Sequence, residues 1–316
     1  MKFYHKILLI VLVAYAPYVW SQPVFKVVPL GIKGGIDESN LSSYMLAVEG
    51  TNDFICLDAG TLHYGIQKAV TARVFKDSVS YVLRNYIKAY LVSHPHLDHV
   101  AGLIINSPED GPKNIYGLPH CIEVLKDKYF TWESWANFAD DGEKPLLKKY
   151  HYNILSAGKE TAIDSTQLTV RAFPLSHVNP YESTAFLVRY NENYLLYLGD
   201  TGADSLEKAS NLRELWKEVG PLIAARKLKA IFMEVSYAND QPNNLLFGHL
   251  TPNLLMKEMD VLALVSGADA LKGLPIVITH MKPSGKKEET IKKQLIVLNK
   301  LNLQLVFPQQ ARLLKF

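Results

Sequence analysis

One seven-residue segment, Ser93 to His99 (SHPHLDH), constrains this chain more than any other feature. It follows the short apolar run Ala89 to Val92, which has the composition of a buried strand. Pro95 disfavours helix at the residue before it and removes one backbone donor, so the segment is predicted to be a loop. Four side chains that can bind a metal are therefore crowded together where a strand ends: His94, His96, Asp98 and His99.

Such a loop is costly in ordinary structure. The imidazoles would repel one another when protonated, and the whole group would be poorly satisfied without a cation. A bound metal converts this cost into binding free energy. The alternative is a solvated polar loop without a ligand. The position of the segment directly after an apolar run favours the metal site.

One loop cannot surround a pair of metal ions, so further ligands should come from distant strand ends. Three residues are each the first ligand-type side chain beyond an apolar run, namely His177, Asp200 and His280. Taken alone, each would be interpreted as a turn or capping residue. Their shared position at strand ends favours the ligand interpretation for all three. Asp58 also ends a strand-like run and could orient a ligand histidine through a hydrogen bond.

Imidazole and carboxylate ligands suit zinc, with manganese and iron as alternatives. Cysteine is scarce, because the sequence holds just Cys56 and Cys121. This excludes a thiolate zinc cage and a disulfide-rich scaffold. We expect two buried thiols and not a disulfide.

Strand-like and helix-like patterns alternate along the chain without a long linker. Alternating or apolar runs predict strands, the first two forming a hairpin, over 43–48, 54–57, 89–92, 167–175, 184–190, 194–198, 230–235, 274–279 and 303–307. Helical spacing of apolar residues predicts helices over 78–88, 253–264 and 288–301. This pattern predicts an α/β fold in which mixed sheets pack together with helices outside.

The N-terminus has the pattern of an export signal. Lys2 and Lys6 precede the ten-residue apolar run Ile7 to Ala16, which is shorter than the roughly 20 residues of a membrane-spanning helix. Cleavage after Ser21 would leave residues 22–316 as a single domain, periplasmic or secreted and without stable membrane insertion. The alternative is an uncleaved N-terminal anchor.

The charge balance argues against a nucleic-acid partner. The chain has 34 Lys and Arg against 31 Asp and Glu, a net charge of +3. Two of the lysines belong to the predicted leader, so the mature charge would fall to +1. Nucleic-acid binding normally requires a strongly basic surface.

The order of the candidate ligands resembles the metal motifs of the metallo-β-lactamase fold, with Asp58 matching the aspartate of its first motif. Local strings are more specific and are similar to the class II cyclic-nucleotide phosphodiesterases. These strings are Leu57 to Thr61 (LDAGT), Gly65-Ile66, Ser93 to His99, Gly248 to Pro252 (GHLTP) and Thr279 to Pro283 (THMKP). The resemblance covers roughly residues 25 to 316.

This resemblance implies a four-layer αββα sandwich with two divalent metal ions at one edge, between the sheets. One metal would be held by His94, His96 and His177. The other would be held by Asp98, His99 and His280, with Asp200 bridging the pair. The implied activity is hydrolysis of 3′,5′-cyclic nucleotides, cAMP or cGMP or both, to 5′-monophosphates by a metal-bridging hydroxide, with Asp98 essential to catalysis.

Three further residues have expected roles near the substrate. His249 is the candidate general acid or phosphate contact, and a structural histidine is its alternative. Lys282 is a candidate phosphate contact, and Thr201 a candidate hydrogen-bonding group beside the metals. The alternative activities are those of a lactonase or β-lactamase, or of an RNA phosphodiesterase, on the same fold; an inactive metal-binding protein is the non-enzymatic alternative. A homodimer is compatible with the sequence.

Overall fold

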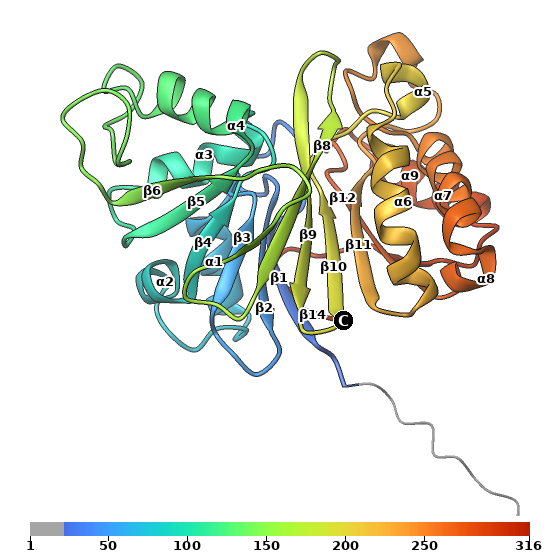
Figure 1. The fold of residues 1–316 in the computed structure, drawn as a ribbon, viewed down its shortest axis with the longest axis horizontal. Helices are drawn as coiled ribbons and strands as arrows, with labels where there is room; N and C mark the ends of the chain where they lie inside the picture. The colour runs from blue at the N-terminus through green and yellow to red at the C-terminus, as the bar shows by residue number, and fades with distance from the viewer. Residues whose placement is uncertain (1–21) are drawn as a thin grey trace, which may run out of the picture.

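Two mixed β-sheets, packed face to face, form the middle of the molecule (Figure 1). The structure is a computed structural model and describes residues 22–316. The predicted signal peptide, residues 1–21, lies outside the described residues. The first sheet consists, in spatial order, of β14 (Leu314–Lys315), β1 (Phe25–Gly31), β2 (Ser43–Val48), β3 (Phe54–Leu57), β4 (Ile87–Leu91), β5 (Lys113–Gly117) and β6 (Tyr150–Ile154).

The second sheet is built from the C-terminal half of the chain. Its spatial order is β13 (Gln304–Val306), β12 (Pro275–Thr279), β11 (Leu228–Glu234), β10 (Asn193–Leu198), β9 (Glu182–Tyr190), β8 (Thr169–Ser176) and β7 (Glu160–Ala162). In each sheet four neighbouring strands are parallel, β3 to β6 in the first and β10 to β13 in the second. Residues that follow parallel strands collect at one edge of a sheet.

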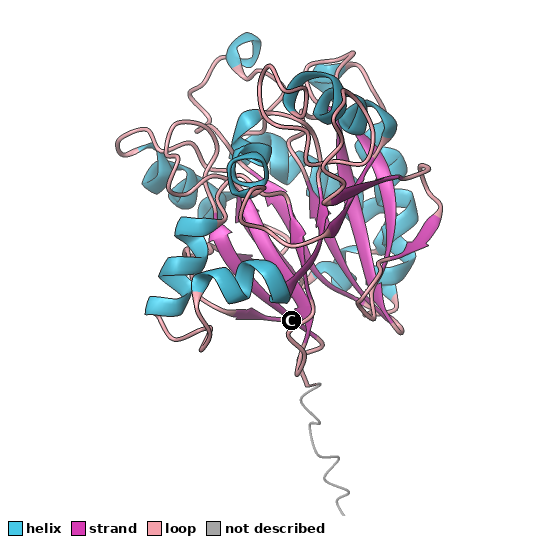
Figure 2. Ribbon diagram, turned by 90° about the vertical axis from the view of Figure 1, so that its left-hand side faces the viewer, coloured by secondary structure: helices cyan, strands magenta, loops and turns pink. Residues whose placement is uncertain are grey.

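Helices cover the outer face of each sheet (Figures 1 and 2). Those over the first sheet are α1 (His63–Thr71), α2 (Val79–Tyr81), α3 (Leu97–Asn106) and α4 (Pro119–Val124). Those over the second are α5 (Asp204–Glu207), α6 (Asn211–Ala224), α7 (Pro252–Ser266), α8 (Ala268–Leu271) and α9 (Lys287–Leu298). The α/β fold with four αββα layers that was expected from the sequence is confirmed. Within residues 22–316, no helix has the length and apolar character needed to cross a membrane.

Three apolar clusters hold the four layers together. One lies between the first sheet and its helices, and a second, around Trp216, lies between the second sheet and its helices. The third fills the space between the sheets, where the ring of Tyr44 packs 5.9 Å from that of Tyr197 and 5.5 Å from that of Phe232. Because this middle cluster fixes one sheet against the other, it also fixes the distance between their site-bearing edges.

Most predicted elements are present, and the largest error concerns residues 78–88. The helical pattern there ends at Tyr86, because α2 continues as a π-helix over Val82–Tyr86 and β4 begins at Ile87. Ile87 pairs with Phe54 of β3, so this apolar residue belongs to a strand and not to a helix. The predicted helix over 288–301 ends early at Leu298. There Asn299 leaves helical geometry and its side-chain amide bonds the backbone of Leu303.

Both cysteines are buried free thiols, as expected. The predicted last strand, 303–307, is β13, but the described chain closes with β14, which pairs with β1 in the other sheet. The pairing of Lys26 with Lys315 joins the two ends of the described chain across 289 positions of sequence. A two-residue strand carries too little periodicity to be predicted.

Candidate metal centre

The histidine-rich loop leads from β4 into α3. His96 is the last extended residue before the helix, with φ −66° and ψ 148°, and α3 begins at Leu97. Pro95 disfavours helical geometry at His94, which agrees with a helix that begins only after the loop. His94 and His99 are buried, whereas His96 is exposed and the side chain of Asp98 is 20% exposed. The loop thus places two ligand-type residues inside and two at the surface.

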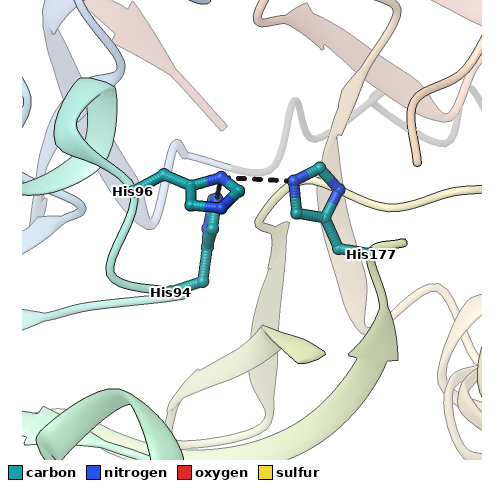
Figure 3. Close-up of side chains that lie close together, drawn as sticks. All are labelled: His94, His96 and His177. Atoms are coloured by element: carbon teal, nitrogen blue, oxygen red, sulfur yellow. Dashed lines mark hydrogen bonds between the residues drawn. The ribbon is translucent and has the colours of Figure 1, made fainter. Parts of the chain in front are cut away.

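The second sheet supplies the remaining candidate ligands, one from each of three strand ends. His177 follows β8, Asp200 lies two residues after β10, and His280 follows β12. Figure 3 shows His177 facing His94 and His96 across the gap between the loop and β8. The Nε2 of His177 lies 3.3 Å from the Nδ1 of His96. The structure therefore brings the distant strand ends to the loop.

The seven candidate ligands form two adjacent groups. In the first group, the ligand atoms of His94, His96 and His177 lie within 4.8 Å of one another. In the second group, the same limit holds for Asp98, His99, Asp200 and His280. The Oδ2 of Asp200 is 3.2 Å from the Nε2 of His280 and 3.8 Å from the Nε2 of His94. Asp200 consequently lies between the two groups.

Hydrogen bonds fix which ring nitrogen faces the cluster in four of the histidines. His99 donates from Nδ1 to Asp58 at 2.7 Å, and His177 donates from Nδ1 to the carbonyl of Gly248 at 2.9 Å. These partners assign the proton to Nδ1 and leave the lone pair of Nε2 facing inward.

The same assignment follows for the other two histidines. The hydroxyls of Ser93 and Ser236 donate to Asp58 and Glu234, so each can accept from a histidine Nδ1. The Oγ of Ser93 accepts from the Nδ1 of His94 at 3.0 Å, and the Oγ of Ser236 accepts from the Nδ1 of His280 at 2.9 Å.

These inward nitrogens fit a cation. The Nε2 atoms of His99 and His280 are 3.2 Å apart, although each presents a lone pair to the other. Two acceptors at this distance repel unless a positive charge lies beside them. Engaged outward nitrogens with converging inward nitrogens are also the usual surroundings of metal-binding histidines. The donor set of imidazole nitrogen and carboxylate oxygen suits zinc, manganese or iron.

Electrostatics favour the ligand-competent protonation states in much of the cluster. Burial and the neighbouring His99 lower the pKa of His94, and burial lowers the pKa of His177 to about 4. Burial raises the pKa of Asp200, but the adjacent His280 and His99 hold it well below its usual range. Burial lowers the pKa of His99, yet the surrounding carboxylates raise it above the usual value. A cation would replace the proton that His99 otherwise attracts.

Asp58 and Glu234 are buried carboxylates behind the cluster. Asp58 follows β3 with φ 55°, and its carboxylate accepts from His99, where the sequence analysis placed it. Glu234 ends β11 and was not singled out from the sequence, although it is the first ionisable residue in the apolar run 230–235. It accepts a hydrogen bond of 2.7 Å from the Nδ1 of His249. Had the apolar run been ended at Met233, the signal that identified Asp200 and His280 would have identified Glu234 as well.

The three candidate substrate contacts differ in where they lie. His249 is buried, with its ring 5.0 Å from that of His177 and 5.2 Å from that of His280. Lys282 is half-buried, and its Nζ lies 5.6 Å from the ring centre of Tyr237.

Thr201 lies differently. It directs its hydroxyl to the backbone carbonyls of Ser176 and Gly202, at 3.3 Å and 3.1 Å. Its link to the cluster is instead through the backbone, because its amide donates to the carboxylate of Glu234 at 3.1 Å.

Proteins of known family are similar to this chain in sequence. The model of the class-II cAMP phosphodiesterase family matches residues 25–305. A 3′,5′-cyclic-nucleotide phosphodiesterase of Aliivibrio fischeri is 41% identical, covering 92% of this chain and 93% of its own length. A probable 3′,5′-cyclic-nucleotide phosphodiesterase of Yersinia pestis is 36% identical, covering 94% and 90%.

Solved structures agree on the fold. Unliganded yeast PDE1 superimposes with a TM-score of 0.85 at 23% identity, covering 93% of this chain and all of that one. The metallo-β-lactamase fold protein YhfI of Bacillus subtilis gives 0.62 at 15% identity, covering 92% and 99%. With the two-sheet architecture, the clustered histidines and aspartates and the match over residues 25–305, this chain belongs to the class-II cAMP phosphodiesterase family.

Proposed function

We propose that this chain hydrolyses 3′,5′-cyclic nucleotides to 5′-nucleoside monophosphates, using divalent cations bound by the two ligand groups. The observation that carries the proposal is the convergence of seven ligand-type side chains from both sheets on one edge. Family membership supports the substrate class, because the similar proteins of Aliivibrio fischeri and Yersinia pestis bear that name.

Two cations fit the donor set. The first group would hold one cation, and the second group would hold the other with Asp200 shared between them. Zinc is the first choice, with manganese and iron as alternatives. When bound, such a pair supplies positive charge for the phosphate oxygens and a water activated as nucleophile.

The chain's own residues must then supply the proton for the leaving group. Hydrolysis breaks the bond between phosphorus and O3′, and the departing alkoxide needs a proton because it is strongly basic. We assign this proton to the Nε2 of His249, since its Nδ1 is engaged by Glu234. Burial lowers the pKa of His249, but the carboxylates of Glu234 and Asp200 raise it above its ordinary value, which favours the protonated form.

Lys282 adds a positive charge near the candidate metal centre. It follows the candidate ligand His280 by two residues, and its ammonium lies near the backbone of Gly35, whose amide donates to Asp98 at 2.9 Å. A phosphate held at the cluster would be within reach of this long side chain. Lysine binds phosphate as a point charge and needs no fixed geometry to do so.

The proposal can be tested by stripping and reloading the protein. Purified protein is dialysed against a chelator, reloaded with zinc or manganese, and assayed with 3′,5′-cAMP, 2′,3′-cyclic AMP, a β-lactam and a lactone. We expect loss of 3′,5′-cAMP turnover on stripping, its return on reloading, and about two metal ions per chain by elemental analysis. Metal-dependent turnover of the lactam or lactone alone would replace the proposed activity with a different one, and turnover unaffected by stripping would refute the metal requirement.

We further propose that residues 1–21 direct export, on the strength of the charged and apolar N-terminal pattern. The mature chain would then begin at Gln22, close to the start of β1. Mass spectrometry of the protein from periplasmic and culture fractions would show this N-terminus. Recovery of the chain with residues 1–21 intact would instead support the uncleaved anchor.

A further inference from the structure

A pocket of about 290 Å³ opens beside the candidate metal centre. Three segments line it: residues 34–36 come after β1, residues 236–241 come after β11, and residues 282–287 come after β12, whose end carries the candidate ligand His280. The pocket is near the lower end of the size range for small-molecule sites, which begins at about 300 Å³. A heterocyclic base is small enough to enter it.

The inner wall of the pocket is bonded directly to the candidate ligands. The amide of Gly35 donates to Asp98 at 2.9 Å, and the hydroxyl of Ser236 contacts the Nδ1 of His280 at 2.9 Å. A Cβ at Gly34 would lie 2.2 Å from the ring of His280, so backbone and imidazole are in close contact there. A phosphate at the cluster would therefore direct one of its substituents into this pocket.

Tyr237 provides an aromatic surface in the pocket. Its ring centre is 5.8 Å from that of His249, which lies on the cluster side, and 5.6 Å from the Nζ of Lys282. The second distance lies within the limit of about 6 Å for a cation–π contact. A phosphate would draw the ammonium toward the cluster and leave the ring free to stack on a flat group.

A fixed hydrogen-bond acceptor lies in the same pocket. The Nε2 of Gln241 donates to the carbonyl of Leu245 at 2.9 Å, which orients the amide. The Oε1 of Gln241 is then left as an acceptor. The neighbouring Asp240 pairs with Lys287, so its charge is already matched within the wall. An aromatic platform combined with one free acceptor suits a base that carries an exocyclic amino group.

We propose that this pocket is the nucleobase subsite, in which Tyr237 stacks on adenine and the Oε1 of Gln241 accepts from its 6-amino group. The proposal rests on the proposed function for the identity of the substrate. Phosphate would lie at the cluster with Lys282, and ribose would span the short distance to the ring. Hypoxanthine, which carries a 6-oxo group in place of the amine, would meet the acceptor unfavourably.

The test separates base recognition from phosphodiester chemistry. Tyr237→Ala, Tyr237→Phe and Gln241→Ala are compared in the metal-loaded protein with 3′,5′-cAMP, 3′,5′-cyclic IMP and the cyclic phosphodiester of 1,3-propanediol, which has no base. We expect Tyr237→Ala to lower kcat/KM for cAMP on the order of tenfold to a hundredfold. The baseless diester should be unaffected, and Tyr237→Phe should restore cAMP turnover because it keeps the ring. Gln241→Ala should reduce the preference for cAMP over cyclic IMP by about threefold to tenfold.

A binding measurement on the metal-free protein gives a second readout. Titration calorimetry compares 5′-AMP with ribose 5-phosphate, and Tyr237→Ala should weaken binding of 5′-AMP alone. Tyr64→Ala is the matched control, because Tyr64 also carries a lysine near its ring, Lys68 at 5.1 Å, but lies on α1. Thermal unfolding shows whether each variant folds.

The outcomes distinguish the two proposals. If the wild type hydrolyses cAMP but Tyr237→Ala leaves the ratio of cAMP to baseless turnover unchanged, the base subsite is refuted and the activity stands. An equal loss for both substrates would also refute it, because Tyr237 would then serve the phosphate end. If the wild type does not hydrolyse cAMP yet binds 5′-AMP more tightly than ribose 5-phosphate through Tyr237, the subsite stands and the proposed activity fails.

Discussion

Asp58 and Glu234 occupy corresponding places in the two sheets. Asp58 follows β3 of the first sheet and Glu234 ends β11 of the second, and both are at most 1% exposed. Asp58 accepts from the Nδ1 of His99 at 2.7 Å, and Glu234 accepts from the Nδ1 of His249 at the same distance. Each therefore fixes one imidazole with its Nε2 left for the site.

Their surroundings show why the two histidines can do different work. The Nε2 of His99 lies 3.3 Å from Asp200 and 3.2 Å from His280, so it faces other ligand atoms. His249 lies outside the seven expected ligands, and its approach to Asp200, at 3.8 Å, is through the nitrogen that Glu234 already engages. In the proposed mechanism, a buried carboxylate would thus orient a metal ligand in one sheet and a proton donor in the other.

Both carboxylates also receive the chain's own donors. Asp58 takes the amide of Ser93 at 2.7 Å and the hydroxyl of Tyr197 at 2.6 Å. The tyrosine belongs to β10, so this bond joins the two sheets. Glu234 takes the amide of Thr201 at 3.1 Å and the hydroxyl of Ser236 at 2.6 Å. These bonds compensate the burial of a charge, which would otherwise be costly.

The largest effect is expected from Asp98, because both the Asp58–His99 pair and the Glu234–His249 pair are proposed to serve the same metal-dependent reaction. Asp98→Ala removes a candidate oxygen ligand whose Oδ2 lies 3.1 Å from the Nε2 of His280. Turnover of 3′,5′-cAMP should fall on the order of a thousandfold or more, because the activated water would be lost. Elemental analysis should show fewer than two metal ions per chain.

The control for Asp98→Ala is His120→Ala, which removes an exposed histidine at the start of α4. It should retain both metal content and turnover. Full activity in folded Asp98→Ala would contradict the assignment of the second ligand group.

Glu234→Gln tests the proton-donor side. The amide preserves the shape but removes the charge that favours protonated His249, so cAMP turnover should fall about a hundredfold. Bis(p-nitrophenyl) phosphate, whose leaving group needs no proton, should lose much less. His249→Ala should show the same pattern with metal content unchanged. Equal losses on both substrates would mean that Glu234 and His249 act through the metal site and not through the leaving group.

Asp58→Asn tests the ligand side and should give the opposite pattern. Weakening the partner of His99 should reduce metal affinity about tenfold to a hundredfold, measured by competition with a chelator. Turnover should then recover in excess metal for both substrates, which Glu234→Gln should not do. If excess metal restores the turnover of both Asp58→Asn and Glu234→Gln, or of neither, then Asp58 and Glu234 do not have the different roles proposed for them.

How much of this site could be predicted follows from how local its parts are. The segment 93–99 encodes its ligands within one loop, and a strand followed by Pro95 is enough to place it. His177, Asp200 and His280 could be found because each ends an apolar run. The resemblance to known motifs gave their division into two groups, which is consistent with the distances between their side chains.

The remainder depends on contacts that no local pattern encodes. The bond from Tyr197 to Asp58 joins residues 139 positions apart and depends on how the two sheets pack. Thr201 directly follows a candidate ligand, yet its hydroxyl turns to the backbone. The pocket around Tyr237 is formed by three loops that meet only in the folded chain.

A third buried carboxylate, Glu258, has no histidine partner among residues 22–316. Its substitution has the smallest expected effect. Glu258 of α7 accepts a hydrogen bond of 3.0 Å from the indole of Trp216. Burial raises its pKa, whereas Glu234, although also raised by burial, has its pKa lowered overall by the adjacent His249. A raised pKa in the folded state means that ionisation of Glu258 destabilises the fold. This penalty is absent below the ordinary value of 4.5 and is complete above the raised value.

Glu258→Gln removes this penalty and keeps an acceptor for Trp216, so it should raise the Tm of the metal-free protein at pH 7 by on the order of 2 °C. The gain should disappear near pH 4, where the wild-type residue is already protonated in both states. Glu214→Gln, on the exposed side of α6, is the control and should change Tm little at either pH. A gain that persists at pH 4 would mean that packing, and not charge, limits stability there, because burial penalises Glu258 only in its ionised form.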